Sequence, residues 1–244
     1  MPSTASGQTH TPAKNLELGI LAGMILTDGW INKGSLGLAN ISQVLIDLFK
    51  DKVTKIFGEQ HFVEFVDKRN GVKIVEVNNK EISEKLLKLI KPSGTKQIPS
   101  FFFTLDSDSL REILRVIFSC DGCVCLGVKW NKREKRWKFT RKVKLTSWNS
   151  EIKNGISRLL RKLEINCNIE ATDVVIERKC EIKKFNEKIG FLDGVKISGK
   201  SKNWKGLEKN QILDLTIKTF NLKKKDLAQF KTKEEVINFL KTLI

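Results

Sequence analysis

Hydrophobic residues recur along the chain with two spacings. One is near 3.6 residues and is typical of amphipathic helices; the other is two residues and is typical of half-buried strands. In the first part of the chain they predict a helix, two strands, a helix, two strands and a helix. Asn70-Gly71, between the last two strands, is a strong hairpin signal. The predicted ranges are 16–27, a strand pair broken at 32–34 and resuming over 36–41, then 43–57, 61–66, 72–77 and 80–90.

The same order of elements returns after a loop over residues 91–100. The second set is predicted at 107–119, 123–130, 137–146, 149–163, 166–172, 174–178 and 181–189. Two further helices, 207–220 and 234–243, break the repeat, and we expect them to pack on the second copy. The chain is therefore divided into a disordered tail (1–14), two repeats (15–105 and 106–205) and a C-terminal helical extension (206–244).

Each of two apolar helices ends on an Asp-Gly pair, Asp28-Gly29 and Asp121-Gly122. Either pair alone could be a turn after a core helix. A carboxylate in the last turn of a helix, however, is disfavoured unless a cation is near. Small residues on facing sides would let the helices pack closely and bring the aspartates together. Two clustered carboxylates repel, and a hard divalent cation resolves the conflict. We also expect Gly29 to end its helix in a left-handed conformation.

Both stretches resemble a known motif. LAGMILTDG, residues 21–29, resembles the LAGLIDADG motif of homing endonucleases and intron maturases, and LRVIFSCDG, residues 114–122, resembles a second copy. Val116 stands where the second motif usually has glycine, which predicts a wider helix crossing. Leu26 and Ser119 replace the motif's first acidic residue, but the later, metal-binding aspartate is kept in both copies. The resemblance covers roughly residues 15 to 200.

This resemblance implies an α+β fold of two pseudo-symmetric αββαββα repeats, with the motif helices paired at the interface and a saddle of antiparallel sheets. It implies two or more Mg²⁺ ions, which Mn²⁺ or Ca²⁺ can replace for binding. Their ligands would be Asp28, Asp121 and the main-chain carbonyls of Thr27 and Cys120.

The resemblance also implies one basic or polar residue per repeat that organises water around the metals. Lys96 matches the loop lysine, and the repeat offset predicts Lys196 as its partner. Gln43 matches a polar position of the same kind. Its partner in the second repeat is Asn149 or, in another register, Trp148. For each lysine the alternative is an ordinary exposed loop residue.

The charge is strongly basic and unevenly distributed. The net charge is +17, and residues 1–122 hold 15 basic against 14 acidic residues, so the excess belongs to residues 123–244. The basic cluster over residues 130–144 lies at a hairpin, which favours a polyanionic partner over a merely lysine-rich composition. The residues expected to face double-stranded DNA are Lys129, Lys138, Arg141, Lys142 and Lys144.

The cysteines do not indicate a disulfide framework, because their number, five, is odd. Cys120, Cys123 and Cys125 have no second cysteine or histidine pair at zinc-finger spacing, so we expect buried, reduced thiols rather than a zinc site. No secretory signal is evident, which predicts a reducing intracellular compartment, and no membrane association is expected.

These observations lead to a functional hypothesis. The resemblance implies a monomeric, intron-encoded, Mg²⁺-dependent endonuclease that cuts both DNA strands across the minor groove and leaves 3′ overhangs. The main alternative is an intron maturase, which would bind its host intron RNA on the same fold. A transcription regulator on this fold is disfavoured because no separate helix-turn-helix is evident, and an intein is disfavoured because the chain lacks the splicing residues.

Overall fold

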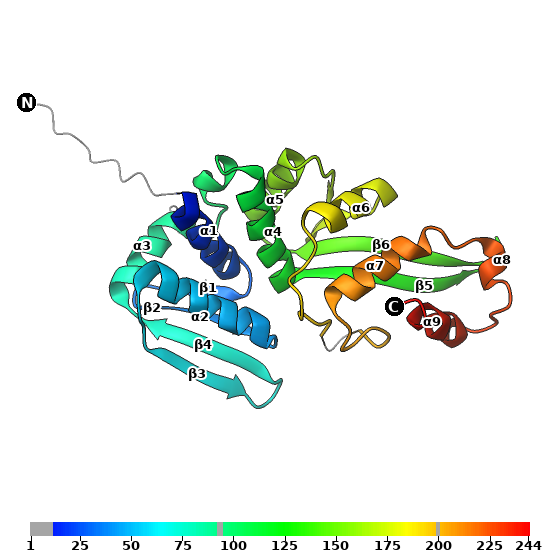
Figure 1. Ribbon diagram of the computed structural model, residues 1–244, viewed down its shortest axis with the longest axis horizontal. Coiled ribbons are helices and arrows are strands. Elements are labelled where there is room, and N and C mark those ends of the chain that lie inside the picture. Colours follow the sequence, from blue (N-terminus) through cyan, green and yellow to red (C-terminus); the bar gives the residue numbers. More distant parts are fainter. Residues whose placement is uncertain (1–11, 92–94, 199–200) are drawn as a thin grey trace, which may run out of the picture.

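Two antiparallel sheets, each covered by helices on one side, form the molecule (Figure 1). The computed structural model describes residues 12–91, 95–198 and 201–244. The first repeat contains α1 (Pro12–Leu26), β1 (Gly29–Ile31), β2 (Ser35–Asn40), α2 (Gln43–Phe57), β3 (Phe62–Asp67), β4 (Val72–Asn78) and α3 (Lys80–Ile90). After a 3₁₀ turn (Ser100–Phe103) the second contains α4 (Ser107–Asp121), β5 (Gly122–Asn131), β6 (Arg136–Thr146), α5 (Ser150–Lys162), β7 (Asn168–Ile169), β8 (Asp173–Ile176) and α6 (Lys179–Lys188).

The two sheets have the same topology. Their strand orders are β1-β2-β4-β3 and β5-β6-β8-β7, which confirms the predicted α+β fold with two αββαββα repeats. The register also corresponds, because Gly29 pairs with Leu38 as Gly122 pairs with Leu145. One predicted strand, 166–172, is much shorter than expected and is reduced to the two residues of β7.

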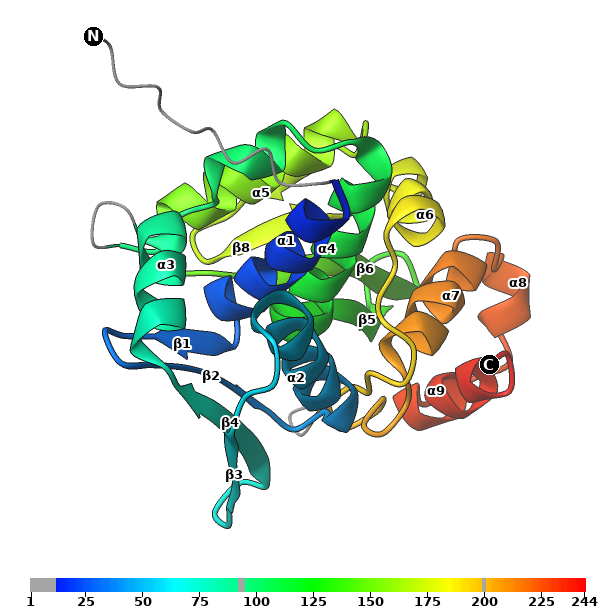
Figure 2. The same cartoon turned by 60° about the vertical axis from the view of Figure 1, so that its left-hand side comes forward.

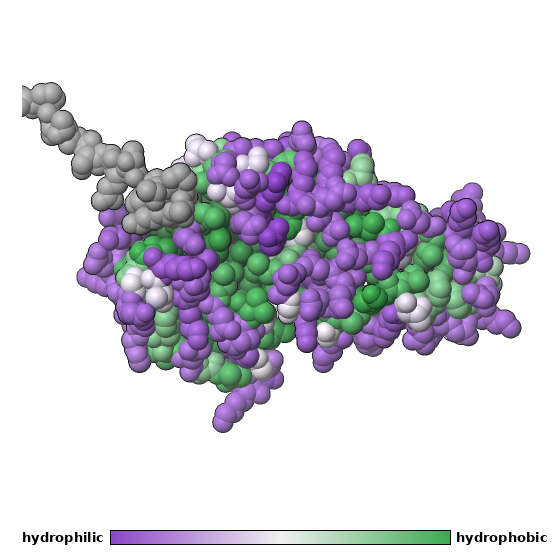
Figure 3. Space-filling view, in the orientation of Figure 1, coloured by the Kyte–Doolittle hydropathy of each residue, from purple (hydrophilic) through white to green (hydrophobic). Residues whose placement is uncertain are grey.

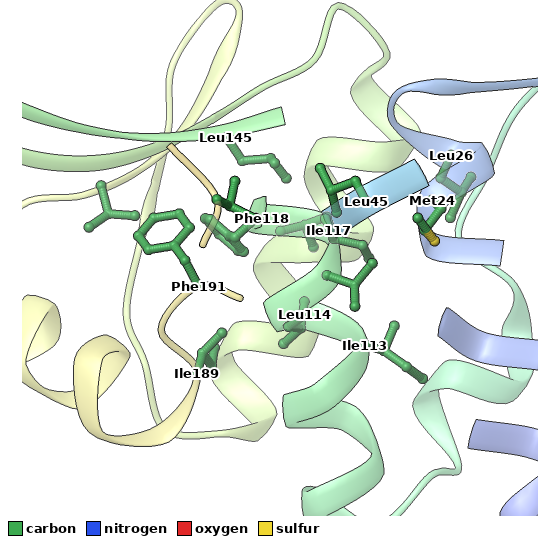
Figure 4. Close-up of a cluster of buried hydrophobic side chains, with 14 of the residues drawn as sticks. Met24, Leu26, Leu45, Ile113, Leu114, Ile117, Phe118, Leu145, Ile189 and Phe191 are labelled. Carbon is green, nitrogen blue, oxygen red and sulfur yellow. The ribbon is translucent and has the colours of Figure 1, made fainter. Parts of the chain in front are cut away.

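Helices α1 and α4 pack side by side between the two sheets (Figure 2). A Cβ atom placed on Gly19 would lie 2.3 Å from Ile113 Cδ1, and one on Gly23 would lie 3.0 Å from Ile117 Cγ1. The glycines of α1 therefore pack against isoleucine side chains of α4. The prediction that both helices contribute small residues to this contact is wrong. Ile113 lies between α4 and α1, whereas Leu145 and Phe191 lie on the other side of α4 (Figure 4).

Gly29 does not take the left-handed conformation expected of it. The glycines with positive φ among the described residues are Gly58, Gly71, Gly190, Gly194 and Gly206. Gly29 instead begins β1 directly after the helix, where a Cβ would lie 2.6 Å from Ile25 Cα and 2.9 Å from the Gly37 carbonyl oxygen. Close backbone packing, rather than a positive φ, requires glycine at this position.

The C-terminal helices α7 (Lys209–Thr219), α8 (Lys224–Leu227) and α9 (Lys233–Lys241) lie on the helical side of the second sheet (Figure 1). Two buried or half-buried indoles fix them there. Trp204 Nε1 donates to the Leu126 carbonyl at 2.8 Å, and Trp137 Nε1 donates to the Phe230 carbonyl at 3.0 Å. This side of the molecule is largely hydrophilic over the extension, and hydrophobic surface appears between the repeats (Figure 3).

The beginning of the chain differs from the expectation in one respect. Helix α1 starts at Pro12, so residues 12–14, which were placed in the tail, are helical. The rest of the predicted tail lies outside the described residues. Among the described residues, every helix is too short or too polar to cross a bilayer.

Candidate active site

Asp28 and Asp121 meet where α1 and α4 end. Asp28 is the second residue after Leu26, the end of α1, and Asp121 is the last residue of α4; their side chains lie in hydrogen-bond contact with each other. The glycines at the crossing bring the helix ends close enough for this contact. The structure therefore places the two aspartates predicted from the paired motifs at one point, at the junction of the repeats.

Burial raises the pKa of both carboxyl groups. Burial raises the pKa of Asp28, and hydrogen bonds from Asn40 and Asp121 oppose the shift. Burial and the negative charge of Asp28 raise the pKa of Asp121 to about 7. Asn40 Nδ2 donates to Asp28 Oδ2 at 2.6 Å, whereas the corresponding position of the second repeat is Ser147, for which no hydrogen bond to Asp121 occurs in the described part of the chain. The two carboxylates thus repel each other, and binding of a proton or a cation relieves this repulsion.

Lys96 closes the C-terminal end of α1. Its Nζ donates to the carbonyls of Ile25 at 2.6 Å and Gly29 at 2.8 Å, next to Asp28. The Ile25 carbonyl lies at the negative end of the helix dipole, so an ammonium group there is favourable. Burial lowers the pKa of Lys96 from its ordinary value, while Asp121 and Asp28 oppose the shift. The loop lysine predicted from the motif family therefore lies beside the aspartate pair.

Lys209, which the sequence did not indicate, does the same for α4. Its Nζ donates to the carbonyls of Ser119 and Gly122, both at 2.7 Å, and burial lowers its pKa. Lys209, rather than Lys196, is thus the counterpart of Lys96. Lys196 is an exposed residue in the loop before α7, and its backbone forms an isolated antiparallel β-bridge with Glu208. The repeat offset failed because the second repeat has a longer loop at this point, and Lys209 is supplied by the extension.

The predicted polar partners are placed less directly. Gln43 is exposed at the start of α2, where its side chain donates to Asp47 and accepts from Lys73. Gly29–Leu38 and Gly122–Leu145 are equivalent strand pairs. Counting onward from Leu38 and Leu145, the residue that corresponds to Gln43 is Ser150, the first residue of α5, and not Asn149 or Trp148.

The two residues predicted as alternative partners of Gln43 have other positions. Asn149 is the N-cap of α5 and donates to the Lys96 carbonyl at 2.6 Å, and Trp148 is 86% exposed. Asn40, which contacts Asp28 directly, was missed. An asparagine that closes a strand after an Asp-Gly helix was the signal available for it.

The donor set suits a hard cation only in part. Within the described residues there is no cluster of three or more His, Cys, Asp or Glu side chains that could hold a metal ion alone. Asp28 and Asp121 supply two carboxylates, and carbonyl oxygens lie at the same helix ends; oxygen ligands are those that Mg²⁺, Mn²⁺ and Ca²⁺ take. The pair fits a divalent ion whose other ligands are carbonyls, waters and a phosphate. Ligation by the Thr27 and Cys120 carbonyls stays a prediction.

The cysteines are free but not all buried. The Cys120 thiol lies beside Asp28 and Thr27, and burial raises its pKa. Cys123 and Cys125 lie on the open face of the second sheet with their sulfurs 3.7 Å apart. Cys123 is exposed, so the expectation of a buried thiol is wrong for this residue; Cys180 is exposed as well.

A cleft of about 1130 Å³ opens at the aspartate pair and reaches both sheets. Ala39, Asn40 and Val72 line it from the first repeat, and Cys125 and Thr140 line it from the second. Lys196 and Lys209 also contribute to its wall. A ligand that occupied this cleft would therefore contact both repeats at once.

Four of the five predicted DNA-binding residues share the open face of the second sheet. Strand pairing places Lys129 opposite Lys138, while Lys142 and Lys144 follow on the same face. Lys142 pairs with Glu170 at 3.1 Å and with Glu177 at 3.2 Å, and Lys144 pairs with Asp173 at 2.6 Å. Lys138 also pairs with Glu134, so three of these four cations are already balanced by carboxylates.

Arg141 was placed on the wrong face. It is the cross-strand partner of Leu126, so it points to the helical side of the sheet. There its guanidinium donates to Thr219 Oγ1 and to the Thr219 carbonyl, both at 2.8 Å, and lies over the rings of Phe139 and Phe220. Arg141 anchors the extension. The prediction for Arg141 is wrong because the two-residue alternation of a strand turns this member of the basic run to the helical side.

Comparisons with known proteins agree with this fold. Residues 108–190 match the LAGLIDADG-like domain family. The chain is 28% identical over 158 residues to the replication factor C small subunit of Pyrococcus horikoshii, which covers 65% of this chain and 16% of that protein. It is 25% identical over 184 residues to the RNA polymerase subunit Rpo1C of Methanocaldococcus jannaschii, covering 72% and 19%. The chain thus spans less than a fifth of the length of either relative, so their names do not indicate its activity.

Two solved structures show the same fold. A variant of I-DmoI in complex with its target DNA and Mn has a TM-score of 0.53 and 13% identity, covering 73% of this chain and 95% of that one. Full-length WhiA from Thermatoga maritima has a TM-score of 0.54 and 13% identity, covering 96% of this chain and 68% of that one. I-DmoI has also been solved with its DNA and Mg, and with DNA and Ca. The family match over residues 108–190, the two Asp-Gly helices and the shared fold are consistent with a two-motif LAGLIDADG protein.

Proposed function

We propose that this protein is a site-specific DNA endonuclease that hydrolyses both strands with divalent metal ions, Mg²⁺ in the cell. The observation that carries the proposal is the buried contact of Asp28 with Asp121 at the junction of the repeats. A regulator that only binds DNA has no need for two mutually repelling carboxylates in a cleft. The comparisons support the fold, which is shared by I-DmoI and by WhiA.

The residues of this chain would act as follows. Asp28 and Asp121 would hold the metal ions, with the Thr27 and Cys120 carbonyls as further ligands. Bound divalent ions supply an activated water and neutralise charge on the phosphate. Lys96 and Lys209 orient the helix-end carbonyls and place positive charge beside the phosphate. Gln43 stays a candidate for ordering water. Asn40 fixes the orientation of the Asp28 carboxylate.

The near-symmetric position of the aspartates motivates the double-strand cut. Each repeat contributes one carboxylate at the same junction, so each strand of a duplex lying across both sheets would meet one of them. We propose cleavage across the minor groove with 3′ overhangs. Because one chain carries both motif copies, a monomer suffices. We also propose a reducing intracellular setting for its five free thiols.

The test is cleavage of a randomised duplex library in Mg²⁺. We expect enriched cut sites with 3′ overhangs for the wild type. Asp28→Asn and Asp121→Asn should each lower double-strand cleavage by at least about a hundredfold, because each removes a carboxylate ligand, while binding in Ca²⁺ persists. Normal cutting of both strands by either variant would contradict the proposal.

Library cleavage also separates the alternative. An inactive wild type that binds structured intron RNA tightly, and duplex DNA only weakly, would reassign the chain as a maturase. An inactive wild type that still selects one DNA sequence would reassign it as a DNA-binding regulator.

A further inference from the structure

The open faces of the two sheets differ in chemistry. The open face of the first sheet is the side that points away from the helices, and it is called here the apolar face. Its members are Trp30, Ser35, Gly37, Ala39, Val63, Phe65, Asp67, Val72, Ile74, Glu76 and Asn78. Not one of them is a cation. By contrast, the open face of the second sheet carries Lys129, Arg136, Lys138, Lys142 and Lys144.

The cations of the first repeat lie elsewhere. Lys73, the one basic residue in β1 to β4, is on the helical side and donates to Gln43. Lys33, Lys68 and Arg69 lie at the two turns, and Arg69 is paired with Asp67 at 2.9 Å. The first repeat can therefore reach phosphates from its turns, but not from the middle of its sheet.

The apolar face is also unusually exposed. The side chain of Phe65 is 51% exposed and that of Val63 is 39% exposed, both on the edge strand β3. Ile74 lies opposite Phe65 on β4, and Ala39 lies opposite Ile74 on β2, so the apolar surface continues inward. Exposed aromatic and β-branched residues in a row on one sheet face indicate a surface that is covered in use.

The occupant is fixed by continuity with the active-site cleft. That cleft is lined by Ala39 and Val72 of the apolar face as well as by Asp28 and Asp121. A duplex centred on the aspartates and lying over the basic face of the second sheet must continue over the apolar face. Strands in a major groove present side chains to base edges, where the C5-methyl group of thymine is the apolar feature.

We propose that the first repeat reads its half of the DNA site by apolar contact of Phe65, Val63 and Ile74 with thymine methyl groups in the major groove. The second repeat supplies most of the phosphate contacts. This inference rests on the proposed function, because it takes a DNA duplex as the ligand of the cleft. Base contacts specify sequence, whereas phosphate contacts set affinity and salt dependence, so the two repeats have different tasks.

The experiment starts from a site selected with wild-type protein in Ca²⁺ and replaces thymine with deoxyuridine in one half at a time. Deoxyuridine pairs as thymine does but lacks the methyl group. Phosphate-ethylation interference is compared between wild type and Lys138→Ala. The phosphates whose effect is lost in the variant mark the half of the site that lies under the second repeat. We expect deoxyuridine in the other half to weaken binding about tenfold, and in the marked half by less than about twofold.

Two neighbouring variants provide the matched comparison. Phe65→Ala should weaken binding to the thymine site and remove the difference between thymine and deoxyuridine, with an unchanged salt dependence. Val66 is 53% exposed on the same strand but points to the helical side, so Val66→Ala should leave both properties intact. Circular dichroism verifies that both variants fold.

The outcomes are distinguishable. Any of three results overturns the inference: the half-site under the first repeat contains no thymine, deoxyuridine does not weaken binding, or Phe65→Ala binds as tightly as wild type. If the wild type still cleaves DNA, the proposed function stands. Loss of self-association in Phe65→Ala, with DNA binding intact, would assign the apolar face to a second copy of the chain. Failure of the wild type to bind any duplex would instead overturn the proposed function.

Discussion

At the candidate site, a lysine closes the end of each motif helix. Lys209 makes with α4 the contacts that Lys96 makes with α1, and it is almost fully buried, whereas Lys196 is exposed in the same cleft. Lys209→Met should destabilise the protein by about 1–3 kcal/mol, because helix-end carbonyls lose a buried charged donor, and should lower cleavage at least about tenfold. Denaturant unfolding and cleavage rates measure both effects.

Lys196→Met is the control for that prediction. It removes the same charge from the same cleft without touching the helix end, so it should have the smaller effect on both measurements. The opposite order, with Lys196→Met the more damaging variant, would restore the pairing inferred from the repeat offset.

The pKa of Asp121, about 7, makes the metal-free protein less stable as the pH rises. In the unfolded chain this carboxyl group has a pKa near 3.8. Between pH 3.8 and about pH 7 the folded protein therefore binds a proton that the unfolded chain has released. Asp121→Asn removes the penalty. Without divalent metal, the variant should be more stable than wild type by about 4 kcal/mol above pH 7 and equal to it near pH ~4. Urea unfolding in EDTA across this range tests the prediction, and a pH-independent difference would refute it.

Among the elements, the passage from a motif helix into its first strand is the most tightly constrained. A methyl group at Gly29 would meet backbone atoms of Ile25 and Gly37, which cannot rotate away. Gly29→Ala should therefore cost about 1–3 kcal/mol of stability by overpacking. Gly34, in the following turn, has no atom within 4 Å of its missing Cβ, so Gly34→Ala should change stability by less than about 0.5 kcal/mol. Equal effects in denaturant unfolding would contradict this account.

The elements themselves were largely predictable. Helix α2 and the β3–β4 hairpin agree with their predicted bounds to within a residue, because each combines a strong hydrophobic period with a clear turn or cap. The details of packing were not. That α4 inserts Ile113 and Ile117 over the glycines of α1 depends on how two helices rotate against each other, which one sequence does not determine. Helix α8, one turn long, left no periodic pattern to detect.

At the scale of the whole molecule, the basic excess divides into two kinds of residue. Lys138 lies on the open face of the second sheet, whereas Arg141 is bound to Thr219 of the extension. Lys138→Ala should reduce the slope of log affinity against log salt by about one and leave stability unchanged. Arg141→Ala should lower stability by about 1–3 kcal/mol and leave that slope unchanged. DNA titrations at several salt concentrations, with unfolding curves, distinguish these behaviours.

The candidate site shows the same division between what sequence can and cannot supply. The two aspartates and Lys96 followed from a motif whose residues are close together in the chain or repeated in order. Lys209 and Asn40 did not, since each reaches the site from a segment without a motif, and only the fold reveals that they converge. The repeat arithmetic failed at Lys196 because an insertion shifts the numbering exactly where the extension begins to contribute.

The position of Lys209 in the extension has a consequence for the order of events during synthesis. Both motif helices and all strands of both sheets precede Lys209 in the chain, so a ribosome delivers the aspartate pair before it delivers the second lysine. A nascent chain can thus pair its helices and build its sheets while one helix end still lacks its ammonium group. Completion of the candidate site is thereby coupled to docking of α7, and a translation product that ends before α7 would have the aspartate pair and Lys96 without Lys209.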